Sequence, residues 1–82
     1  MAIQPGDAYA AYAFLGMLYS DKMGFEPSMA MVMLLDSHSP ERKEHVISEL
    51  QRIGAIEHVD GKWTITDEGM TLYNTYVRNN LM

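Results

Sequence analysis

Two short alternating stretches, separated by Asp60-Gly61, restrict the possible folds of this chain more than any other part of it. Residues 55–59 and residues 63–66 each alternate apolar with polar side chains, which is typical of half-buried strands. An Asp-Gly pair between such stretches favours a two-residue turn, because both of its central residues tolerate a positive φ. The sequence therefore predicts a β-hairpin over about residues 55–66.

Directly before the hairpin, residues 40–53 have the pattern of an amphipathic helix. Ser39 can cap its first turn, Pro40 suits the first helical position, and Gly54 suits the position after its end. The apolar residues form a single stripe and are Val46, Ile47, Leu50 and Ile53. The side opposite this stripe carries Glu41, Glu44, His45, Ser48, Gln51 and Arg52. We expect a helix that faces solvent and is braced against the core by its apolar stripe.

Three further helices are expected, at about residues 7–20, 27–35 and 67–80. The first two are apolar on most faces, with Asp7 as the N-cap of one and Pro27 at the first position of the other. A strand is the competing interpretation of the second, but methionine and leucine outnumber β-branched residues there. Thr66 is expected to cap the last helix. With 82 residues and no cysteine, the chain is predicted to be one domain without disulfides, α+β in class and mostly helical.

The order of these elements resembles a winged helix-turn-helix domain. The likeness rests on Val46–Ile56 and Trp63–Gly69. There, a leucine and an Ile-Gly pair close the third helix, a short wing follows, and Thr-Asp-x-Gly opens the next helix. Bacterial, archaeal and phage regulators of the MarR and PadR type carry a similar pattern, and the likeness is best over about residues 27–72. It implies a single winged-helix domain over residues 1–82 that binds duplex DNA as a homodimer, with its third helix in the major groove.

The resemblance places the DNA contacts on the third helix and on the wing. The N-terminal part of a recognition helix reaches the base edges, which arginine, serine and histidine can read. The expected contacts are Ser39, Arg42, Lys43, His45, Ser48 and Arg52 on the helix, and His58 and Lys62 on the wing. The formal charge of −5 opposes DNA binding. So do Glu41 and Glu44, which would bring carboxylates close to phosphates.

The apolar excess of the remaining helices predicts an association surface. A domain of this size has too little interior to bury all of their apolar side chains, and exposed apolar patches mark association surfaces. We expect the first and last helices to pair across a two-fold axis in a homodimer, through Tyr9, Tyr12, Tyr19, Leu72 and Tyr76. The methionines of the second helix, which are Met29, Met31 and Met33, are expected to fill the core. An adaptable peptide-binding surface is the alternative for them.

Other classes of function find no support in the sequence. The three histidines and Asp36 match no common metal-ligand spacing, and there is no phosphate-binding glycine loop, His-Glu-x-x-His motif or nucleophile elbow. No apolar run approaches the roughly 18 residues that cross a bilayer, and no secretory signal is seen, so a cytoplasmic location is expected. We expect a small DNA-binding transcriptional regulator without a cofactor, a metal or enzymatic activity. The alternatives are an acidic protein-interaction module on the same scaffold, such as a phage-type inhibitor or adaptor, and a subunit of a larger transcription or replication complex.

Overall fold

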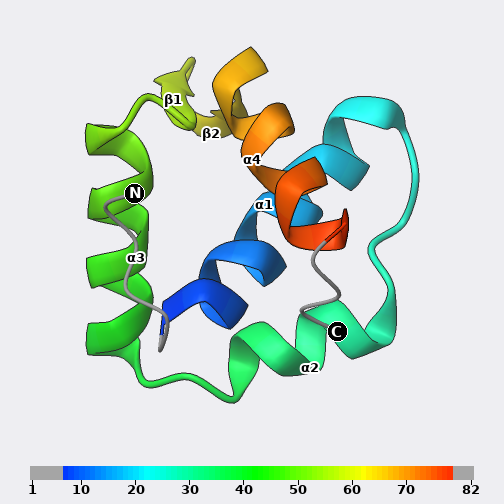
Figure 1. Ribbon diagram of the computed structural model, residues 1–82, viewed down its shortest axis with the longest axis vertical. Coiled ribbons are helices and arrows are strands. Elements are labelled where there is room, and N and C mark those ends of the chain that lie inside the picture. The colour runs from blue at the N-terminus through cyan, green and yellow to red at the C-terminus, as the bar shows by residue number, and fades with distance from the viewer. Residues whose placement is uncertain (1–6, 79–82) are drawn as a thin grey trace.

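The helix α1 (Ala8–Met23) runs through the centre of the molecule in the computed structural model, which describes residues 7–78. In Figure 1, α2 (Met29–Asp36) lies below α1, α4 (Asp67–Arg78) lies above it, and α3 (Pro40–Arg52) rises at the left. The strands β1 (Ile56–Val59) and β2 (Lys62–Ile65) lie at the top, between α3 and α4. Contacts join α1 to α2, α3, α4 and β2. The predicted class, α+β and mostly helical, is confirmed, and so is the order of the elements.

Small side chains let neighbouring elements approach α1 from several sides. Ala10, Ala11 and Ala13 are completely buried there, together with Leu15. The rest of the core comes from every other element or its flank: Met31, Val46, Leu50, Ala55, Ile56, Ile65 and Tyr76. Each fully buried side chain of leucine size contributes about 1.5–3 kcal/mol. The core therefore surrounds α1 and holds α3 and the hairpin against it.

The hairpin forms as the sequence predicts, one residue shorter at each end. Its antiparallel register pairs Ile56 with Ile65 and Val59 with Lys62. The turn residues Asp60 and Gly61 have φ angles of 51° and 79°. Such a turn needs positive φ at both central positions, and aspartate and glycine are among the residues that adopt it most readily. Asp60-Gly61 is thus confirmed as the turn.

A junction around Thr66 fixes α4 to the end of α3. The Thr66 hydroxyl accepts a hydrogen bond from the Gly69 amide at 3.1 Å and donates one to the Gly54 carbonyl, which confirms Thr66 as the cap of α4. The Thr66 amide donates to the Ala55 carbonyl at 3.0 Å. A Cβ atom at Gly69 would collide with that same carbonyl. Glycine is therefore required at this position by a close approach between two backbone segments.

Two predicted helix boundaries differ from the structure by two residues or more. The helix α1 continues to Met23, because Gly24, with φ of 80°, provides the left-handed end that the polar residues from 20 onwards do not. The helix α2 begins at Met29 rather than 27, because Ser28 is its N-cap and accepts from the Met31 amide at 3.2 Å. Asp7 stands at the N-cap position of α1, but its side chain makes no capping hydrogen bond. The predicted end of the last helix at residue 80 lies outside the described residues.

The predicted dimer interface is wrong at two positions, because both belong to the core of a single chain. Tyr12 is 8% exposed and Tyr76 is 5% exposed. Tyr12 and Tyr19 both stack on Tyr73 of α4, with ring centroids 5.3 Å and 5.1 Å apart. The packing between α1 and α4 thus uses Tyr12 and Tyr19, which the sequence predicts to contact a second copy of the chain. Leu72 is half-buried, and Tyr9 alone of the five is exposed.

Burial also changes the acidity of two tyrosines on α4. Burial, followed by the neighbouring Tyr12, raises the pKa of Tyr73 to about 12 from an ordinary value of 10.0. Burial raises the pKa of Tyr76 as well. Both phenols therefore remain protonated at neutral pH, as expected of rings that pack within the protein.

Candidate binding surfaces

The helix α3 presents one polar face to solvent, as its sequence pattern predicts. Val46 and Leu50 of its apolar stripe are buried, and Ile47 and Ile53 are half-buried against the core. The residues predicted to face outwards are all exposed, and they are Glu41, Glu44, His45, Ser48, Gln51 and Arg52. Ser39 caps the helix by accepting from the Arg42 amide at 3.1 Å. The predicted contact residues of α3 are thus at the surface, except for Lys43.

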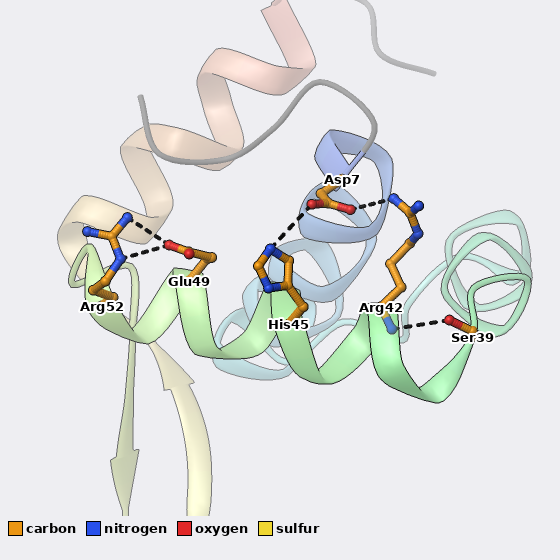
Figure 2. A network of polar contacts seen from close by, with 6 residues as sticks. All are labelled: Asp7, Ser39, Arg42, His45, Glu49 and Arg52. Atoms are coloured by element: carbon orange, nitrogen blue, oxygen red, sulfur yellow. Dashed lines mark hydrogen bonds and ion pairs between the residues drawn. The ribbon is translucent and has the colours of Figure 1, made fainter.

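The N-terminal half of α3 is tied to the start of α1 through Asp7 (Figure 2). The Asp7 carboxylate forms an ion pair and hydrogen bond with the Arg42 guanidinium, and its other oxygen lies 3.6 Å from Nε2 of His45. Asp7 is buried, whereas both of its partners are exposed. Arg42 and His45, two of the expected DNA contacts, therefore lie beside a carboxylate of the same chain. The sequence predicts Asp7 only as a helix cap, and its pairing with Arg42 across 35 positions has no local signal.

A second ion pair lies on the same side of α3, one turn from its C-terminus (Figure 2). Nη2 and Nε of Arg52 lie 2.7 Å and 2.8 Å from Oε2 of Glu49. An ion pair between exposed side chains contributes only about 0–1 kcal/mol. Breaking this pair therefore costs little free energy, and the pair does not by itself prevent Arg52 from contacting a phosphate.

Lys43 is placed differently from the other predicted contact residues. It is half-buried and lines a cavity of about 210 Å³ between α1, α2 and α3. The other lining residues are all apolar, and they are Ala10, Phe14, Leu35, Val46 and Ile47. A lysine in such a place covers apolar surface with its aliphatic stem. Lys43 therefore lies at the inner edge of the exposed face of α3.

The hairpin adds little positive charge to this surface. His58 and Lys62 are both exposed, and the His58 ring packs on Trp63 across the strands, with centroids 4.8 Å apart. The hairpin carries two acids, Glu57 and Asp60, against one lysine, while α3 carries three acids and three bases. Carboxylates therefore outnumber cationic groups over α3 and the hairpin together.

A different surface, on the outer side of α2, exposes large apolar side chains. Met29 is 72% exposed and Met33 is 64% exposed, whereas Met31 is buried against α1. Phe25, in the connection before α2, is 63% exposed, and Met23 at the end of α1 is also exposed. The prediction that the three methionines fill the core is correct for Met31 and wrong for Met29 and Met33. We call Met29 and Met33 the α2 surface.

Metal-ligating side chains do not gather in the part of the chain that the structure describes. Within residues 7–78, no group of three or more His, Asp or Glu side chains is arranged to hold a metal ion. None of the helices in this range is both long and apolar enough to span a membrane. The structure displays one polar, slightly acidic surface on α3 and the hairpin and one apolar surface on α2.

Comparisons with protein-family models, with curated proteins and with solved structures found no match to this chain.

Proposed function

We propose that this protein is a winged-helix-type module that works by binding another protein. The observation that carries the proposal is the α2 surface, where Met29 and Met33 are mostly exposed on one side of a short helix. Nothing in the fold requires methionine there, because α2 already packs on α1 through Met31. Exposed apolar clusters of this kind mark association surfaces.

The arrangement of α3 supports a second candidate, a DNA-binding regulator that acts as a homodimer. An exposed helix follows the three-residue connection from α2, and a hairpin lies beside its C-terminal end, as in winged helices that read the major groove. The exposed residues Ser48, Arg52 and Lys62 are available to a duplex.

Electrostatics favour the protein-binding function over the DNA-binding one. Affinity for duplex DNA comes largely from lysine and arginine side chains that neutralise phosphates. On α3 and the hairpin, Glu41, Glu44 and Glu57 are exposed and form no ion pair within the described residues. Bringing these carboxylates close to phosphates costs free energy. The four cationic side chains of α3 and the hairpin do not offset this cost, because two of them already form ion pairs with carboxylates.

A titration of a fluorescent mixed-sequence DNA duplex at low salt separates the two functions. The proposed function predicts no rise in anisotropy at micromolar protein. Binding that weakens by about 0.9 log units per log unit of salt for each phosphate contacted would favour the DNA-binding candidate instead.

Substitutions locate any DNA binding that this titration reveals. The double variant Arg42→Ala with Lys43→Ala removes two of the expected contacts, and Lys22→Ala, at the end of α1, is the matched control. Binding that is lost in the double variant and kept in the control would assign DNA recognition to α3 and overturn the proposal. Binding that is equal in both would place the DNA elsewhere, and it too would contradict a purely protein-binding role.

A further inference from the structure

The α2 surface lies opposite the side of α2 that packs on α1. Successive residues of a helix are rotated by about 100°, so Met29 and Met33 share one face while Met31 points the other way. The burial of these side chains agrees, since Met31 is buried and the other two are the most exposed large apolar side chains in residues 7–78. The surface is therefore a continuous apolar stripe along the outside of the helix.

Phe25 lines a separate groove, which neither Met29 nor Met33 lines. It has a volume of about 330 Å³ and lies between α1 and α2. The other lining residues are Phe14, Met17, Leu18, Asp21, Pro27 and Leu35. The α2 surface itself relies on exposed apolar anchors, which carry most of the binding energy in many interfaces. Its methionine side chains can adapt their shape to a bound surface.

Acidic residues lie at the end of α1 and at each end of α2. Asp21, Glu26 and Asp36 are exposed, and their carboxylates form no ion pair or hydrogen bond within residues 7–78. Lys22 is the only basic residue between positions 21 and 36. The surface is thus apolar in the middle and negative at its edge, which is complementary to a segment with apolar residues on one side and lysine or arginine around them.

We propose that the α2 surface binds a basic amphipathic segment of a partner protein. This inference rests on the proposed function and names the partner's chemistry. The apolar side chains of the segment contact Met29 and Met33, while its cationic side chains meet Glu26 and Asp36 near the two ends of α2. A helix with apolar anchors three and four residues apart fits an apolar surface of this length.

A second copy of the chain fits the same surface less well. Two α2 surfaces facing each other would bring four carboxylates together, because each copy contributes Glu26 and Asp36. Like charges across an interface disfavour association, and anionic lipid is disfavoured for the same reason.

The test uses the whole protein labelled with ¹⁵N and a synthetic helical peptide of leucine and lysine in an amphipathic pattern. The inference predicts amide shifts concentrated in residues 21–36. The double variant Met29→Gln with Met33→Gln is expected to weaken binding about tenfold, as loss of central apolar anchors does. Val77→Gln, which changes an exposed apolar residue on α4, is the matched control and is expected to leave binding within about twofold.

Two further measurements test the charge and the occupant. A peptide of glutamine and lysine with the same charge should bind weakly, and Glu26→Gln with Asp36→Asn should reduce the salt dependence of binding to the leucine-lysine peptide. Equal binding of both peptides, or shifts spread over α3 instead of α2, would overturn the assignment. A homodimer in sedimentation that Met29→Gln with Met33→Gln dissociates would show that a second copy covers the surface, and the assignment would again be wrong.

The outcomes also separate this inference from the proposed function. A peptide that binds on α3 while DNA does not bind contradicts the inference and leaves a protein-binding role intact. Binding of duplex DNA through α3 contradicts the proposed function, whatever the peptide does.

Discussion

The helices α2 and α4 both pack on α1, but they use their apolar residues in opposite ways. The helix α4 turns Tyr73 and Tyr76 inwards, where one stacks on α1 and the other is buried. The helix α2 buries Met31 and leaves Met29 and Met33 in solvent. Most of the apolar side chains of α4 are thus explained by the stability of the fold, and so are Met31, Leu34 and Leu35 of α2, but Met29 and Met33 are not. A large apolar residue that is exposed adds little to the stability of the fold, and it is therefore a candidate for function.

The same substitution at two glycines should show that the contact of α4 with the α3–hairpin junction tolerates added volume less than the contact of α1 with α2. Gly69→Ala pushes a Cβ atom into the Ala55 carbonyl, which is backbone and cannot move aside. We expect it to lower the free energy of unfolding by about 3 kcal/mol, the cost of severe overpacking. Gly16→Ala meets the sulfur and terminal methyl of Met31, which can rotate away. Its expected cost is about 1 kcal/mol or less, partly offset by the better helix propensity of alanine.

Urea unfolding of both variants measures this difference. Equal losses of unfolding free energy would mean that Met31 is held as rigidly as the backbone at the α3–hairpin junction. The contrast between the two contacts would then disappear. A loss confined to Gly69→Ala would confirm that the α2 side tolerates repacking.

The aromatic stack between α1 and α4 should make stability depend on alkaline pH. The pKa of Tyr73 is raised to about 12 in the folded protein, and the unfolded chain has the ordinary value of 10.0. The folded state therefore keeps a proton that the unfolded state releases. The resulting stabilisation is complete below pH 10 and is lost as pH rises from 10 towards 12.

Unfolding measured between pH 8 and pH 12 tests this dependence, with tyrosine ionisation followed by absorbance. Tyr73→Phe should flatten the decline above pH 10, whereas Tyr9→Phe, which changes an exposed ring, should leave it unaltered. A decline of the same slope in wild type and Tyr73→Phe would show that the stack does not hold this proton.

Much of the fold could be predicted because its signals are local. Asp60-Gly61 marks the turn, one apolar stripe orients α3, and Thr66 caps α4, all within a few residues of the structure they specify. The pairing of Asp7 with Arg42 could not be predicted, because it joins positions far apart in the sequence.

The sequence left open whether the methionines of α2 are buried or exposed, for a different reason. All three methionines of α2 are equally apolar, so composition does not say which of them is buried. The choice is made by Gly16 on α1, whose missing side chain leaves the space that Met31 fills. A contact between two helices therefore decides which side of α2 is available to a partner.

The smallest expected effect is the one that bears most directly on function. Met33→Gln changes an exposed side chain and should alter the free energy of unfolding by no more than about 0.5 kcal/mol. The same change at Met31 puts an amide into the core and should cost about 2 kcal/mol or more. Thermal and urea unfolding of the two variants distinguish these cases. If Met33→Gln were as destabilising as Met31→Gln, the outer face of α2 would serve the fold, and its exposure would no longer point to a partner. A Met33 variant of unchanged stability that no longer binds the leucine-lysine peptide would separate binding from folding within a single helix.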